Sequence, residues 1–207
     1  METNLIKQEL TGTIATFSQH QYQPNTWETE RLFLRPFTAK DFADLYRFYS
    51  HPEVMRFIGK GARTESETLA ELISFITHWR QHNFGNFAII HKASGKLMGR
   101  TGLYFSDRCK EAQFGYVLDK SYWGQGLGLE AGKASLDYGF KVLEFEQIVA
   151  FAMPENVVSR KILSEKLGMH CITDNFIYSG IQYAYYSIGR AEYLTSSSLR
   201  VKACKSS

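Results

Sequence analysis

The stretch Ser121–Gly132, Ser-Tyr-Trp-Gly-Gln-Gly-Leu-Gly-Leu-Glu-Ala-Gly, constrains the fold of this chain more than any other. Its glycines Gly124, Gly126 and Gly128 follow an apolar run, Phe114–Leu118. A helical pattern comes next, formed by Leu127, Ala131, Ala134 and Tyr138. The order predicts a strand, a glycine turn and a helix. Glycines permit positive φ and close approach to a ligand, and the N-terminus of a helix attracts anions. We therefore expect an anion-binding turn.

Composition limits what kind of anion this is. The chain has 207 residues, enough for one domain with a buried core, and its 44% hydrophobic and 22% charged residues argue against a disordered or fibrous protein. The net charge of +3 suits an anionic ligand. It is too small and too dispersed for nucleic acid, which requires a dense basic stripe. We expect no nucleic-acid partner.

The cysteines and the first residues of the chain indicate which cellular compartment to expect. Cys109, Cys171 and Cys204 are scattered and odd in number, which favours reduced thiols in a cytoplasmic protein and suggests no metal site. The segment Met1–Lys7 lacks the pattern of a signal peptide, and no apolar run approaches the ~18 residues of a membrane span. We expect a soluble protein with no membrane partner.

Three regions are predicted along the chain. Residues 1–26 are polar and rich in Gln and Thr, and are expected to form a loose N-terminal extension. The domain spans 27–190, and 191–207 is expected to be a solvated C-terminal tail. The first strand is predicted at Thr29–Pro36, followed by a short helix capped by Asp41.

Further elements follow from capping and alternation. Thr64 and Glu67 form a capping box for a helix to about residue 80. Its expected buried face is Leu69, Leu72, Ile73, Ile76 and Trp79. The expected strands are 86–91, 97–105, 111–118, 147–152, 169–178 and 181–188, and a further helix runs from Asn156 to Gly168.

Two common phosphate-binding motifs do not fit the glycine stretch. A dinucleotide fingerprint requires a third glycine where Leu129 stands, and an acidic residue at the end of the next strand, where Ala152 and Met153 stand. A P-loop requires Ser or Thr after its lysine, but Lys133 lies inside the helix and is followed by Ala134.

The remaining candidate is a coenzyme A loop. Gln125-Gly-Leu-Gly128, with Gly115-Tyr-Val-Leu-Asp119 before it and Glu130-Ala131 after it, resembles the GNAT-type N-acetyltransferases, particularly the ribosomal-protein N-terminal acetyltransferase branch. Supporting pieces are Thr29-Glu-Arg-Leu32, Leu34-Arg-Pro36, Asn156-Val-Val-Ser159 and Glu165-Lys-Leu-Gly-Met169. The resemblance covers about residues 29–189.

The resemblance implies an α+β fold: a single GNAT-like domain with a mixed, mostly antiparallel sheet of six to seven strands and helices on both faces. It implies that loop amides wrap the pyrophosphate of acetyl-CoA and that the strand before the loop pairs with the pantetheine arm. The residues implied to bind acetyl-CoA are Tyr116, Val117, Leu118, Gly124, Gln125, Gly126, Leu127, Gly128, Leu129 and Asn156. No metal is implied.

The same resemblance implies direct attack of an amine on the thioester, with the backbone N–H near Tyr116 as oxyanion donor. Many relatives carry a tyrosine acid where this chain has Leu163. In the N-terminal acetyltransferase branch the serine of Asn-x-x-Ser has this role, and the resemblance therefore implies Ser159 as the proton donor. Two carboxylate positions are also changed, to Gln113 and to Tyr183-Ala184. Glu111 could act as base through water, or the amine could lose its proton in solution.

Several alternatives stay open. The acceptor could be a peptide N-terminus or a small-molecule amine, received by a pocket walled by some of Phe57, Trp79, Tyr104, Tyr178, Tyr183, Tyr185 and Tyr186. The altered catalytic positions also permit a non-catalytic CoA-binding sensor. Nucleotide binding at the same glycines is a third hypothesis. Pairing of two copies through an edge strand, giving a homodimer, also stays open.

Overall fold

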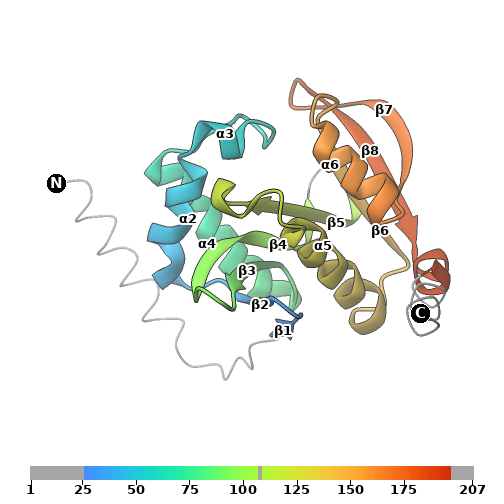
Figure 1. Cartoon of the computed structure of the whole chain (residues 1–207). Helices are drawn as coiled ribbons and strands as arrows, with labels where there is room; N and C mark the ends of the chain where they lie inside the picture. The colour runs from blue at the N-terminus through green and yellow to red at the C-terminus, as the bar shows by residue number, and fades with distance from the viewer. Residues whose placement is uncertain (1–25, 107–108, 197–207) are drawn as a thin grey trace.

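The computed structural model describes residues 26–106 and 109–196. In this part of the chain, eight strands form one sheet in the order β1-β2-β3-β4-β5-β6-β8-β7 (Figure 1). The strands are β1 Trp27–Glu28, β2 Leu32–Pro36, β3 Asn86–His91, β4 Lys96–Ser106, β5 Cys109–Leu118, β6 Gln147–Ala152, β7 His170–Tyr178 and β8 Ile181–Gly189. Only β5 and β6 pair in parallel. The expected mixed, mostly antiparallel α+β fold is confirmed, with slightly more strands than expected.

Helices cover both faces of the sheet. One group comprises α2 Phe42–Tyr49, α3 Pro52–Met55 and α4 Glu65–His82, and the other comprises α5 Leu127–Asp137 and α6 Val157–Lys161. Short helical turns add to these at Ala39–Asp41, Lys120–Tyr122, Tyr138–Val142 and Ile162–Lys166. In Figure 1, α5 and α6 lie in front of the sheet. The core is accordingly divided into two clusters of buried side chains.

The capping box that begins α4 is confirmed. The Thr64 hydroxyl accepts from the Glu67 amide at 3.2 Å, and the Glu67 carboxylate accepts from the Thr64 amide at 2.9 Å. The predicted buried face of α4 is wrong in part, because Ile73 is 43% exposed. The buried residues are Thr68, Leu72, Phe75 and Trp79. The stripe includes Thr68 because its hydroxyl donates to the Thr64 carbonyl one turn earlier.

Asp41 occupies the N-cap position of α2 as predicted, but its side chain makes no capping hydrogen bond to that helix. Its carboxylate instead accepts from the Thr38 amide at 2.7 Å and binds the guanidinium of Arg35 through two oxygens. Thr38 is therefore the residue that begins this helical segment. The reason is that Arg35, six residues earlier on β2, binds both oxygens of the carboxylate.

The last described residues pack against the domain. Residues 190–196 are helical, and Tyr193 is 7% exposed with its ring 4.9 Å from that of Phe140. A helix therefore follows β8 directly and extends beyond the predicted domain boundary at residue 190. The expected N-terminal extension lies outside the described residues up to residue 25, as does the expected tail from residue 197.

Among the described residues, no helix combines the length and the apolar character that crossing a membrane requires.

Candidate functional site

The sheet opens between its two parallel strands. β5 and β6 pair only over residues 112–114 and 148–150. Beyond Phe114, β5 continues to Leu118, whereas β6 continues to Ala152 while paired with β8. The two strands therefore diverge, and the second half of β5 pairs with β4 on one side only.

The register shows which backbone groups face this gap. The Asp119 amide donates to the Met98 carbonyl at 2.8 Å, so residue 119 points toward β4. Because backbone groups alternate along an antiparallel strand, those of Val117 also point toward β4 and those of Tyr116 and Leu118 point into the gap. The Leu118 carbonyl accepts from the indole N–H of Trp123 at 2.9 Å. The N–H groups of Tyr116 and Leu118 and the Tyr116 carbonyl are directed toward a ligand position.

The glycine turn begins where β5 ends. Asp119 accepts from the Ser121 amide at 3.0 Å, and the Gln125 side chain donates to the Ser121 carbonyl at 3.1 Å. Gly124 and Gly126 have φ of 72° and 75°, the left-handed region that disfavours side chains. The turn is thus held by its own polar side chains and closed by its glycines.

The turn delivers free amides to the end of the gap. Glu130 N donates to Gly126 O at 3.1 Å as the first bond within α5, so the amides of Leu127, Gly128 and Leu129 have no acceptor in the helix. A Cβ on Gly128 would lie 3.4 Å from the side chains of Leu118 and Tyr116. The missing side chain lets α5 approach β5 closely. An anion there would meet amide donors and the positive end of the helix dipole.

The segment before β2 braces this turn. The Glu130 carboxylate accepts from Arg31 Nε at 2.7 Å, from the Arg31 amide at 2.9 Å and from the Thr29 hydroxyl at 2.5 Å. Arg31 Nη1 also donates to the Gln125 carbonyl at 2.9 Å. Sequence reasoning found both pieces, Thr29–Leu32 and Glu130-Ala131, but not their contact, because about 100 residues separate them.

Burial alone would raise the pKa of Glu130, but the hydrogen bonds from Thr29 and Arg31 hold it below its ordinary value. The carboxylate is therefore ionised and paired.

Ser159 and Tyr116 meet on the α5 and α6 face. Asn156 caps α6 as predicted, accepting from the Ser159 amide at 3.1 Å. Burial raises the pKa of Tyr116, and a hydrogen bond between its side chain and that of Ser159 offsets part of the rise. Leu163, at the position where relatives carry tyrosine, is 2% exposed. The Ser159 side chain thus lies close to the Tyr116 hydroxyl, which sequence reasoning missed because it considered only the backbone of Tyr116.

The opposite face of β5 carries a buried polar network. Arg100 binds the Tyr49 hydroxyl and donates to Asn86 at 3.2 Å, with Glu71 4.0 Å away. Burial lowers the pKa of Arg100, but Tyr49 and Glu71 more than offset this and keep the guanidinium charged. Arg100 Nη1 lies 3.6 Å from the position a Cβ on Gly115 would take. Sequence reasoning missed the network, since only the sheet register brings its members together.

Gln113 and the aromatic residues predicted to wall the acceptor pocket lie on different faces of the sheet. Gln113 donates to the Tyr104 hydroxyl at 2.6 Å and is 4% exposed, so this position is neutral and buried. Tyr185 stacks on Phe151 at 5.1 Å and lies near Glu111, which together with burial raises the pKa of Tyr185. Tyr186 instead points to α6, and Trp79 is buried in the core. These two residues cannot wall a pocket with Tyr185.

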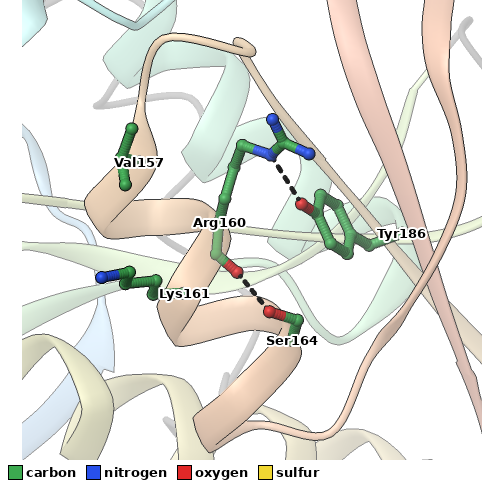
Figure 2. A pocket seen from close by; sticks show the side chains of 5 residues that line it. All are labelled: Val157, Arg160, Lys161, Ser164 and Tyr186. Atoms are coloured by element: carbon green, nitrogen blue, oxygen red, sulfur yellow. Dashed lines mark hydrogen bonds between the residues drawn. The ribbon is translucent and has the colours of Figure 1, made fainter.

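A pocket of about 240 Å³ lies beside α6, outside the gap. Figure 2 shows Arg160 extending from α6 to the Tyr186 hydroxyl, with Ser164 bonded to the Arg160 carbonyl. The remaining lining residues are Val157 and Lys161. Neither Asn156 nor Ser159 lines this pocket. No group of three or more His, Cys, Asp or Glu side chains suited to a metal was found in residues 26–106 and 109–196.

Comparisons with known proteins agree on one family. The family model described as "Acetyltransferase (GNAT) domain" matches residues 31–170. The chain is 32% identical over 143 residues to "Uncharacterized N-acetyltransferase YnaD" of Bacillus subtilis (strain 168), covering 68% of this chain and 80% of that protein. It is 33% identical over 141 residues to "Uncharacterized N-acetyltransferase p20" of Bacillus licheniformis, covering 67% and 79%.

Solved structures show the same fold. An acetyltransferase (GNAT family) from Bacillus anthracis superimposes with a TM-score of 0.69 at 26% identity, covering 80% of this chain and 99% of that one. A ribosomal-protein-S5-alanine acetyltransferase from Vibrio fischeri shares the fold with a TM-score of 0.66 at 20% identity, covering 81% and 98%. The divergent strands, the glycine turn and the family match agree, and the chain belongs to the GNAT acetyltransferase family.

Proposed function

We propose that this protein transfers an acetyl group from acetyl-CoA to a primary amine by direct attack. The observation that carries the proposal is the open edge of β5, which leads to the free amides at the start of α5. A pantetheine arm is an extended chain with amide groups, so it can pair with an open strand edge as a further strand would. Its pyrophosphate then lies at a helix N-terminus.

Each part of the donor has a proposed partner. The pyrophosphate takes the amides of the turn, from Gly124 to Leu129. The pantetheine arm takes the groups of Tyr116 and Leu118 that face the gap, while Val117 holds this edge against β4. Asn156, at the start of α6, flanks the arm and orders the helix that carries Ser159. No metal is required by this arrangement.

The chemistry needs a neutral amine, a polarised carbonyl and a proton for the thiolate. The amine lone pair attacks the thioester carbon, and the Tyr116 N–H stabilises the developing oxyanion, a contact worth ~3 kcal/mol. When the carbon–sulfur bond breaks, the thiolate takes a proton through the Ser159 hydroxyl, which regains one from the water that accepts the amine's proton. The new ammonium loses its proton to water. An α-amine has an ordinary pKa of about 7.7 to 8.0, so a neutral fraction exists at pH 7 without a base.

A charge in the turn tests the donor site. Gly126→Asp should weaken CoA binding by at least about 100-fold, because a carboxylate would face the phosphates. Gly180→Asp is the matched control: Gly180 has φ of 74°, like the 75° of Gly126, and has open space around it in the β7–β8 turn. Calorimetric titration should show normal affinity for the control. Unchanged affinity in Gly126→Asp would contradict the assignment.

A non-catalytic CoA sensor is the second candidate, supported by the buried Leu163 and the neutral Gln113. Release of free thiol from acetyl-CoA over a panel of amines and N-terminal peptides separates the two. The enzyme releases thiol with at least one amine class, and mass spectrometry of the product identifies the acceptor. Tight CoA binding without turnover on any amine would favour the sensor.

A further inference from the structure

Arg31 holds the glycine turn, and we infer that it also binds the pyrophosphate of CoA, supplying a guanidinium donor that the turn itself lacks. This inference rests on the donor site of the proposed function. It assigns a role to the segment before β2, which lies far from the turn in the sequence.

The contacts of Arg31 place its guanidinium at the turn. Nε binds Glu130 at 2.7 Å and Nη1 donates to the Gln125 carbonyl at 2.9 Å. Nη2 has no hydrogen-bond partner among the described residues and lies 3.6 Å from the position a Cβ on Gly126 would take. The side chain is 42% exposed. One nitrogen is thus available to a ligand seated on the turn.

The side chains of the turn offer a bound phosphate no positive charge of their own. Residues 121–132 contain no Lys or Arg, and their one carboxylate is that of Glu130. Glu130 follows directly on the free amides, so its charge would repel a phosphate. Arg31 and Thr29 bind both carboxylate oxygens. Arg31 therefore neutralises Glu130 and directs a further donor to the anion.

The segment is itself anchored, so Arg31 is fixed before a ligand arrives. The Lys92 amide donates to the Arg31 carbonyl at 2.9 Å, and Lys92 Nζ donates to the Thr29 carbonyl at 2.6 Å. Preorganised donors bind anions at lower entropic cost than mobile ones. The guanidinium presents its donors in a fixed plane, toward Glu130, the Gln125 carbonyl and a bound anion, whereas a lysine ammonium is a single point charge on a flexible chain.

Affinities for ligands that differ in their phosphates test this role. Arg31→Ala in the full chain should raise the Kd for CoA about 10- to 100-fold, as expected for a lost charge-assisted contact. The same factor is expected for dephospho-CoA, which keeps the pyrophosphate. The Kd for pantetheine, which lacks phosphate, should stay within about twofold of wild type. Arg31→Lys should recover part of the CoA affinity.

Arg190→Ala is the charge control, since Arg190 pairs with Glu144 away from the turn. Unchanged CoA affinity in Arg31→Ala would overturn the inference. An equal loss of affinity for pantetheine would also overturn it, because that result indicates a structural role alone. A loss of affinity confined to CoA would overturn it as well, because that result indicates a contact with the 3′-phosphate. If thermal unfolding shows that Arg31→Ala is not folded, the Kd values of Arg31→Lys and wild type for the same three ligands are compared instead. Failure of the wild-type chain to bind CoA would instead refute the donor site.

Discussion

Tyr116 contributes its backbone and its side chain to different parts of the site. Its backbone groups face the gap between β5 and β6, and its ring lies on the α5 and α6 face with its hydroxyl near Ser159. The Asn156-x-x-Ser159 spacing predicted both the helix cap and the position of Ser159. The pairing of Ser159 with Tyr116 depends on how α6 packs over β5, which no local pattern encodes.

Removal of the Ser159 hydroxyl tests its role in proton transfer. Ser159→Ala should lower kcat by about 100-fold and leave the Kd for CoA unchanged, because general acids typically contribute 10²–10⁴-fold. Ser164→Ala is the matched control, one turn further on, where the hydroxyl only bonds the Arg160 carbonyl. Steady-state kinetics and calorimetry measure the two quantities. Equal kcat in wild type and Ser159→Ala would assign the proton to Tyr116 or water.

At the scale of elements, the second half of β5, beyond Phe114, has one paired and one open edge. The alternation of its backbone groups predicts which amides a ligand covers. CoA should slow hydrogen exchange at the Tyr116 and Leu118 amides about tenfold or more, because the pantetheine arm would bind them. The Val117 amide, already directed at β4, should change little. Amide exchange followed by NMR measures this, and equal protection at all three positions would contradict the predicted edge.

The contact between β2 and the start of α2 rests on Asp41. Burial raises the pKa of Asp41, but hydrogen bonds from Arg35 and Thr38 outweigh it and bring the pKa below its ordinary value. A carboxyl whose pKa falls on folding stabilises the fold above its unfolded pKa, and this contribution is lost as pH falls through the folded pKa.

Asp41→Asn should therefore lower the free energy of unfolding by about 1–3 kcal/mol at pH 7, with a smaller difference near pH 3. Asp44→Asn is the control, because Asp44 is exposed and its ion pair with Arg47 is longer, at 3.5 Å. This substitution should lower the free energy of unfolding by less than about 1 kcal/mol. Urea unfolding at the two pH values measures both. A difference for Asp41→Asn that does not shrink in acid would show that the charge is not responsible.

At the scale of the molecule, the sheet consists of two parts joined by the short β5–β6 pairing. A ligand in the gap would contact both the open edge of β5 and the start of α6, and would therefore hold the two parts of the sheet together. CoA at 100 times its Kd should stabilise the chain by about 2.7 kcal/mol. ATP and NAD at the same concentration should give no shift in thermal unfolding, because the turn lacks both nucleotide motifs. A comparable shift with ATP or NAD would favour the nucleotide-binding hypothesis.

Local chemistry by itself determined most of the elements: the Thr64 capping box, the Asn156 cap, the strands around the glycine turn and the left-handed Gly168 after the helical turn Ile162–Lys166. These follow from hydrogen bonds and backbone conformations within a few residues, which the sequence encodes directly. Only the tertiary structure decided which residues meet across the sheet. Arg31 binds Glu130 and Arg100 reaches Glu71 because strand register and helix packing bring distant side chains together. The physical reason is that such contacts depend on burial and on geometry summed over the whole sheet.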